Sequence, residues 1–315
     1  MLPVRQRRLS DGNRGLDMST NRIKKPNPAW KLSSLCLVIV TILCLVCLAE
    51  RAYAQDPNAQ PETSQANATQ ESDEDLLKAL QNPVADLISV PIQNNINPGI
   101  APYGRVQNVI SLQPVIPVNL TDNWLLVTRI IQPILWQPYP DQKSGGVFGL
   151  GDMNPSFFLA PRNPGALIWG AGPAVVIPTA TSQILGQGKL SLGPSAVVLA
   201  QPGPWTVGAL VSNVWSVAGS GGRPPVNRMA LQYFLVYNLP HDWYLNSSPT
   251  ITADWRAPAG NVWTVPFGLG VGKLVNIGQA PVDFSGTLYG NATTPAGMPT
   301  WSMSFQVTLL FPKKQ

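Results

Sequence analysis

The sequence predicts an all-β fold: a single antiparallel transmembrane β-barrel of about twelve strands, preceded by a signal peptide and a short disordered tail. Three observations favour this fold: alternation of apolar and polar residues within short segments, alternation of short and long connections, and tryptophans near the segment ends. In the closing segment WSMSFQVTLLF, Trp301, Phe305 and Leu309 share one parity, while Ser304 and Thr308 share the other. That period is typical of a strand with one face in an apolar and the other in a polar environment.

The first 54 residues have the order of a secretory signal peptide. A basic stretch, residues 24–31, precedes an apolar run over residues 35–49, and an A-x-A site ends at Ala54. We therefore predict signal cleavage after Ala54, with Met18 as an alternative start of the chain. An uncleaved membrane anchor stays the alternative, because the apolar run is near the lower length limit of a spanning helix.

Removal of this leader changes the charge of the chain. Nine of the 21 Lys and Arg and three of the 16 acids lie in residues 1–54, so the exported part carries 12 basic and 13 acidic groups. The sequence pI of 9.2 therefore reflects the leader, and nothing in the exported part predicts a nucleic-acid partner. All three cysteines also lie in the leader, which excludes a disulfide or a thiol nucleophile from the exported part.

Residues 55–82 are predicted to be a disordered acidic tail. Its first part, residues 55–75, is rich in Gln, Asn, Ser and Thr and has acids but no basic residue, so it is too polar to bury a core. Residues 73–81, DEDLLKALQ, predict a short helix with acids in its first turn. Such a helix is either a purely local structure or a contact that docks on or plugs another part of the protein.

From residue 83 onward, glycine and proline recur every few residues and leave little room for long helices. We predict that residues 83–315 form the barrel. Its twelve predicted strands are residues 85–97, 105–118, 124–136, 147–160, 166–178, 188–200, 205–217, 227–239, 243–255, 261–272, 280–290 and 300–311. Five prolines lie inside these strands, where the missing N–H requires a bulge or a strand end: Pro155, Pro173, Pro194, Pro249 and Pro266.

The connections between the predicted strands are sorted by length. LTDN, RNPG, PGP and PHD are short, whereas QPYPDQKSGG, TATSQILGQG, VAGSGGRPP and NATTPAGMP are long. A transmembrane barrel has short periplasmic turns and longer external loops, with an even number of strands. The pattern therefore predicts the outer membrane of a Gram-negative bacterium, with the long loops outside the cell.

Tryptophan spacing measures the length of two predicted strands. Trp124 and Trp136 are twelve residues apart, and so are Trp243 and Trp255, which places each pair on one face. Twelve residues at about 3.3 Å each, tilted by about 45°, rise about 28 Å, which is close to the hydrocarbon thickness of a bilayer. Each pair is therefore predicted to mark the two aromatic girdles of the barrel. The alternative is that these tryptophans anchor a soluble core.

Ten polar residues are predicted to line the lumen. Parity or the cost of placing a charge against lipid, about 2 to 4 kcal/mol, assigns them to the inner face. They are Arg105, Gln113, Arg129, Asp152, Asn154, Lys189, Arg228, Gln232, Asp254 and Asp283. Because twelve strands lie between a filled barrel and an open porin, we expect a narrow, partly filled lumen. The set contains both positive and negative side chains. These side chains therefore either pair with one another for purely structural reasons or bind a solute, and both alternatives stay open.

The sequence predicts no enzyme, no metal and no cofactor. The exported part has one histidine, His241, in a predicted turn that is a poor place for a catalytic base beside a serine. Asp152, Asp254 and Asp283 lie on separate strands with no His or Cys nearby. The stretches GLGD, GAGP and GLGVGK resemble phosphate loops, but no helix follows any of them, so structural glycines are expected.

Several segments of the predicted barrel together resemble a known family. They are NPVADLISVPIQNN, LQPVIPVNLTDNW, FGLGDMNPSFFLAP, WGAGPAVVIPTAT, GKLSLGPSAVVLAQPGPWTVGALVSNVWSVAG, DWRAPAGNVWTVPFGLGVGKL and VTLLFPK. This ordered set resembles the bacterial outer-membrane family described as meta-pathway of phenol degradation proteins, also labelled transporters or neuromedin U. The likeness runs over about residues 82 to 313. It implies a porin-like barrel connected by name with the uptake of aromatic compounds.

The sequence therefore predicts an outer-membrane channel or transporter for small, hydrophobic or aromatic molecules. Two alternatives stay open: a structural or adhesive barrel without transport, and a secreted soluble β-sandwich that binds a ligand. The predicted partners are outer-membrane lipid, a small-molecule solute and the outer-membrane assembly machinery. That machinery has to recognise a last strand in which Pro312, Lys313, Lys314 and Gln315 follow Phe311.

Overall fold

The computed structural model describes residues 73–312 with the exception of residue 279. The predicted signal peptide, its cleavage after Ala54 and most of the predicted tail lie outside the described residues. Residues 73–80 are helical, within the range predicted for a short helix. No helix in the described part of the chain is long and apolar enough to cross a membrane.

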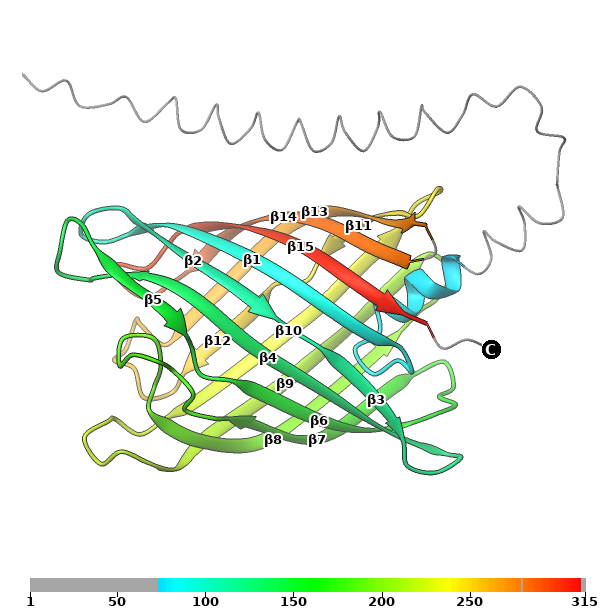
Figure 1. The fold of residues 1–315 in the computed structure, drawn as a ribbon, viewed down its shortest axis with the longest axis horizontal. Coiled ribbons are helices and arrows are strands. Elements are labelled where there is room, and N and C mark those ends of the chain that lie inside the picture. Colours follow the sequence, from blue (N-terminus) through cyan, green and yellow to red (C-terminus); the bar gives the residue numbers. More distant parts are fainter. Residues whose placement is uncertain (1–72, 279, 313–315) are drawn as a thin grey trace, which may run out of the picture. The chain divides into compact units, whose positions relative to one another are not determined.

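The strands form one closed antiparallel sheet (Figure 1). The segments are β1 (Ile88–Ile100), β2 (Arg105–Leu112), β3 (Val115–Asn119), β4 (Trp124–Pro138), β5 (Gly146–Leu150), β6 (Asn154–Pro161), β7 (Ile168–Val176), β8 (Lys189–Ala200), β9 (Trp205–Gly219), β10 (Asn227–Asn238), β11 (Trp243–Ser247), β12 (Thr250–Asp254), β13 (Trp263–Ile277), β14 (Ala280–Thr293) and β15 (Trp301–Phe311). The ring closes because β1 pairs with β15 and β9 pairs with β10.

Twelve strands make up this ring, as predicted. Three of them are interrupted, because β2 and β3 share both neighbours, β11 and β12 share both neighbours, and β5 and β6 both pair with β4. The predicted borders hold to within a few residues. The largest difference is in β13, which runs to Ile277 rather than residue 272 and pairs with β14 over this extra length.

The two ends of the barrel differ in the length of their connections. Residues 139–145, 177–188, 220–226, 255–262 and 294–300 join strands at one end, which we call the long-loop end. Residues 120–123, 162–167, 201–204 and 239–242 join them at the other, the short-turn end. The helix of residues 73–80 and the end of β15 both lie at the short-turn end (Figure 1).

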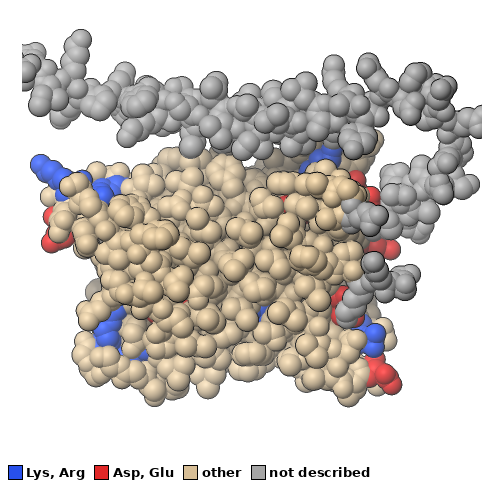
Figure 2. Space-filling view, viewed as in Figure 1, with Lys and Arg blue, Asp and Glu red and all other residues tan. Residues whose placement is uncertain are grey.

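Aromatic residues gather at both ends of the outward surface. At the short-turn end the rings of Trp124 and Trp169 lie 6.1 Å apart, and at the long-loop end those of Trp255 and Trp263 lie 5.3 Å apart. Between them the outward face exposes apolar side chains such as Leu192, and Figure 2 shows almost all charge at the two ends of the barrel. An apolar band between aromatic girdles is the surface of a barrel that spans a membrane.

The five prolines predicted inside strands fall at irregular positions. Pro249 lies in the gap between β11 and β12, Pro155 lies next to the gap before β6, and Pro266 lies at a bulge between β13 and β14. Pro173 and Pro194 face each other across β7 and β8. The ladders on the far side of each of these two strands skip the same positions, so no N–H is missed there.

Beside these prolines the neighbouring strands approach so closely that two positions require glycine. A Cβ atom at Gly172 would lie 1.9 Å from the carbonyl oxygen of Phe157 on β6, and one at Gly193 would lie 1.8 Å from that of Asn213 on β9. Backbone on the neighbouring strands therefore occupies the space that a side chain would need. The prolines and glycines of the motifs GAGP and KLSLGP serve the shape of the wall.

We predict that Gly193→Ala destabilises the barrel, because the new methyl group meets a backbone carbonyl that cannot move without β9. The expected loss is about 1 to 3 kcal/mol, typical of overpacking. It is measured as a lower urea midpoint for refolding into lipid vesicles, followed by the heat-dependent shift on a gel. Gly165→Ala is the matched control, since Gly165 has no atom within 4 Å of its Cβ position and no positive φ. Equal midpoints for both variants would contradict the close approach.

Candidate functional site

The lumen is apolar toward the short-turn end. A cluster of buried apolar side chains faces inward from β3, β4, β6, β8 and β10, and the segment before β1 adds one more. We call this set the inner apolar cluster, and it consists of Val84, Val115, Leu125, Val127, Phe158, Ala160, Val197, Leu199 and Phe234. Since β3 and β10 lie on opposite sides of the ring, the cluster fills the cross-section of the barrel at this height.

The helix of residues 73–80 docks on the short-turn end of the lumen. Leu77 is 2% exposed and packs against Val236, Tyr244, Leu274 and Leu310, which lie on four strands. Polar contacts fix the same segment: Gln201 donates from its amide to the carbonyl of Lys78, and Thr206 donates from its hydroxyl to the Gln81 side chain. The predicted helix is therefore a contact that closes this mouth.

Tyr244 and Asp283 form a buried pair next to the docked helix. The Tyr244 hydroxyl lies 2.9 and 3.0 Å from the two carboxylate oxygens of Asp283 and donates to that carboxylate, which is 1% exposed. The tyrosine ring lies over Gly272, where a Cβ atom would come within 2.2 Å of it. The stretch GLGVGK therefore makes room for a ring in the lumen, as expected for structural glycines.

A series of hydrogen-bonded polar side chains runs along the inner wall of the barrel, on the long-loop side of the inner apolar cluster. Arg129 on β4 donates to the Gln113 amide oxygen at 2.8 Å, and Gln113 donates to Gln93 at 2.8 Å. Gln93 in turn donates to the Ser304 hydroxyl at 2.9 Å. These hydrogen bonds connect β4 with the gap between β2 and β3, and that gap with β1 and β15. The structure brings the predicted residues Gln113 and Arg129 together inside the barrel.

Asp152 holds a long loop rather than standing free in the lumen. Its two carboxylate oxygens accept hydrogen bonds from the backbone N–H of Ala180 at 3.2 Å and of Gln187 at 2.6 Å. Arg223, from the next long loop, donates to the carbonyls of Gln187, Gln183 and Gly186. Sequence reasoning missed Arg223, because its partners are backbone carbonyls that carry no residue-type signal.

Four of the remaining predicted residues lie at the long-loop end. Arg105 donates to the carbonyl of Gln142 at 3.2 Å. Arg228 and Asp254 form an ion pair at 3.0 Å, with side chains 50% and 33% exposed. Lys189 is the first residue of β8, at the same end.

The last two predicted residues lie at gaps in the strands. Asn154 donates from its amide to the carbonyl of Asp152 at 2.9 Å, in the gap before β6. Gln232 donates to the carbonyl of Ser248 at 3.3 Å, in the gap between β11 and β12. Both amides therefore serve backbone carbonyls that the interrupted ladders leave without a partner.

His241 lies in the exposed turn between β10 and β11, and it has a positive φ of 62°. Its neighbour Asp242 lies beside the helix. Burial raises the pKa of Asp242 above its ordinary value, the charge of Asp73 raises it further, and His241 lowers it. Among the described residues no group of three His, Cys, Asp or Glu could hold a metal ion.

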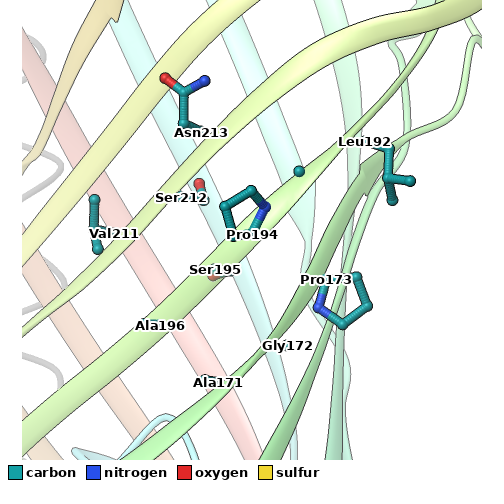
Figure 3. A pocket seen from close by; sticks show the side chains of 11 residues that line it. Ala171, Gly172, Pro173, Leu192, Pro194, Ser195, Ala196, Val211, Ser212 and Asn213 are labelled. Atoms are coloured by element: carbon teal, nitrogen blue, oxygen red, sulfur yellow. The ribbon is translucent and has the colours of Figure 1, made fainter.

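A groove of about 700 Å³ opens on the outer wall where β7, β8 and β9 meet (Figure 3). Small side chains form it: Ala171, Pro173, Pro194 and Ala196 leave a depression beside the larger Leu192. Its walls carry no charge. The groove faces outward between the girdles, so it belongs to the surface that meets lipid rather than to the lumen.

Comparisons with known proteins agree on the fold. No protein-family model and no curated protein match the chain. Among solved structures, an outer-membrane channel from Pseudomonas putida F1, described as COG4313, is 16% identical, with a TM-score of 0.56 over 72% of this chain and 96% of that one. At this identity the likeness shows the fold.

Two further solved structures are more distant. The outer membrane phospholipase A of Escherichia coli is 13% identical, with a TM-score of 0.39 over 76% of this chain and 98% of that one. A structure described as the CymD monoaromatic hydrocarbon channel is 9% identical, with a TM-score of 0.43 over 75% of this chain and 92% of that one. Likenesses this weak support no statement about activity.

We predict that Tyr244→Phe destabilises the barrel by about 1 to 3 kcal/mol, because it leaves a buried carboxylate without its donor. Urea unfolding followed by tryptophan fluorescence measures the loss. Tyr237→Phe is the control, since that tyrosine lies in the short-turn girdle against Trp205. Asp283→Asn combined with Tyr244→Phe should restore part of the stability, because it removes the unpaired charge. Equal stability of both single variants would show that the pair contributes nothing.

Proposed function

We propose that the protein is an outer-membrane channel for small, hydrophobic molecules, including aromatic ones. The observation that carries this proposal is the apolar level that the inner apolar cluster forms across the lumen, which any solute has to pass. A porin for hydrophilic solutes has a polar, water-filled lumen, and an apolar level in the lumen would favour neither inorganic ions nor sugars. The likeness to an outer-membrane channel of the same fold supports the proposal.

The outward surface supports a place in the outer membrane. Closed barrels of this kind leave no unpaired backbone at the lipid boundary, and the girdles of tryptophan match the two interfaces. We propose that the short-turn end faces the periplasm and the long-loop end faces outside. Lipid of the outer membrane is then the partner of the outer wall, and a small solute is the partner of the lumen.

The route through the barrel is narrow and closed at the short-turn end. The inner apolar cluster and the docked helix both occupy the lumen there. A solute therefore enters from the long-loop end, and its passage requires the helix or the cluster to move. This fits a channel for occasional small apolar solutes better than an open pore.

The structure excludes one of the two alternative functions and leaves the other to an experiment. The closed ring of twelve strands excludes a two-sheet sandwich. A structural or adhesive barrel without transport shares the same fold, so flux separates it from a channel.

Flux into liposomes tests the proposal. Vesicles that contain the refolded protein should take up benzyl alcohol faster than protein-free vesicles and should exclude sugars, because the apolar wall favours the aromatic solute. Uptake is followed by rapid mixing with an absorbance probe inside the vesicles. The control is the same protein heated to unfold it before reconstitution. No difference between the two preparations for any solute would favour the structural barrel.

Single cysteines test the orientation. Ser144 lies exposed at the long-loop end and Asn163 lies exposed at the short-turn end. In intact cells, Ser144→Cys should react with a membrane-impermeant maleimide, whereas Asn163→Cys should react only after the outer membrane is opened. Labelling of Asn163→Cys in intact cells would reverse the orientation.

A further inference from the structure

Arg129 lies on the inner face of β4, at the boundary between apolar and polar parts of the lumen. Its ladder partners are Val115 on β3 and Ser156 on β6. Val127, two residues toward the short-turn end, pairs with Phe158 two positions further along β6. The guanidinium therefore projects from just above the inner apolar cluster.

The guanidinium has one partner among the described residues, the Gln113 amide oxygen. Arginine carries five N–H donors, so most of its donors are left for another group. Neither the ion pair of Lys78 with Glu74 nor that of Arg228 with Asp254 involves Arg129. Arg129 is only partly buried, so its side chain is accessible from the lumen.

Five of the other predicted charges around the lumen are engaged. Asp283 accepts from Tyr244, and Asp152 accepts from two backbone N–H groups. Arg105 donates to a backbone carbonyl at the long-loop end, where Arg228 is paired with Asp254. Lys189 also lies at that end, so Arg129 is the cation that stands in the middle of the pathway.

Charge is distributed unequally between the two ends of the barrel (Figure 2). Among the described residues, six Lys and Arg lie at the long-loop end with three acids. They are Arg105, Lys143, Lys189, Arg223, Arg228 and Arg256, with Asp141, Asp152 and Asp254. The short-turn end reverses the balance, with three bases and seven acids. They are Lys78, Arg162 and Lys273, with Asp73, Glu74, Asp75, Asp86, Asp122, Asp242 and Asp283. Such a field draws anions into the long-loop end.

We propose that Arg129 binds the carboxylate of a small aromatic or aliphatic acid, whose apolar body reaches the buried side chains of Val115, Val127 and Phe158 when these move apart. The planar fork of the guanidinium matches a carboxylate, and the partly desolvated lumen strengthens the contact. This inference rests on the proposed function and narrows it to solutes that join an apolar body to one negative charge.

The test compares two solutes of equal shape, benzoate and benzyl alcohol, in proteoliposome uptake. The unaltered protein should favour benzoate, and Arg129→Gln should lower the ratio of benzoate to benzyl alcohol flux by about tenfold, the effect of one charge-assisted hydrogen bond. Arg129→Lys should lie between the two, because it keeps the charge and loses the fork. Arg162→Gln is the matched control, since it removes the same charge from an exposed turn at the short-turn end, outside the cationic set that draws anions in.

The outcomes separate this inference from the proposed function. Uptake of neither solute by the unaltered protein overturns the channel itself. Uptake of benzyl alcohol without preference for benzoate, or a preference that survives in Arg129→Gln, overturns the anion site and leaves the channel standing. Should Arg129→Gln fail to fold, competition in the unaltered protein decides. Saturable inhibition of benzyl alcohol uptake by benzoate supports the site, and its absence overturns it.

Discussion

The whole structure depends on one requirement: in hydrocarbon, every backbone N–H and C=O must find its partner inside the protein. The sheet meets it by closing on itself, with β1 and β15 in register from Ile88 to Ile96. Where the ladder is interrupted, side chains replace it. Gln132 donates to the Gly151 carbonyl, while the Thr179 hydroxyl donates to that carbonyl and accepts from the Met153 N–H. Polar residues at the gaps in the strands are thus part of the closure.

Closure with twelve strands also sets what the lumen can hold. The space is too narrow for a wide aqueous pore, so inward side chains meet across it. The sequence supplies two kinds of lining: apolar residues toward the short-turn end, and a polar chain through Arg129 and Gln113 above them. The lining of the lumen therefore changes from a cationic, hydrogen-bonding level to an apolar one. The docked helix completes the apolar level.

Strand number, strand borders and the two faces follow from the sequence, because each depends on neighbours in the chain. The period of two residues and the spacing of Trp124 and Trp136 are local signals. Arg129 could be assigned to the lumen for a physical reason as well, since the opposite face would set its charge in lipid. The partners could not be predicted. Asp152 and Arg223 bind backbone atoms of a loop about 30 residues away, and nothing in that loop's composition marks it as a ligand.

The meeting of β1 with β15 makes the order of strands around the barrel a cycle. Closure of the ring alone does not determine which strand comes first in the sequence, because the first and last strands could be any two neighbours of the twelve. The helix of residues 73–80 lies at the short-turn mouth and leads directly into β1, so the first strand of the barrel starts at that mouth. An even number of strands then returns the chain to the same mouth. A domain fused after Phe311 would thus lie on the same side of the membrane as the helix. Circular permutants with new termini in the long loops would keep every strand pairing, but the helix would then no longer precede the first strand.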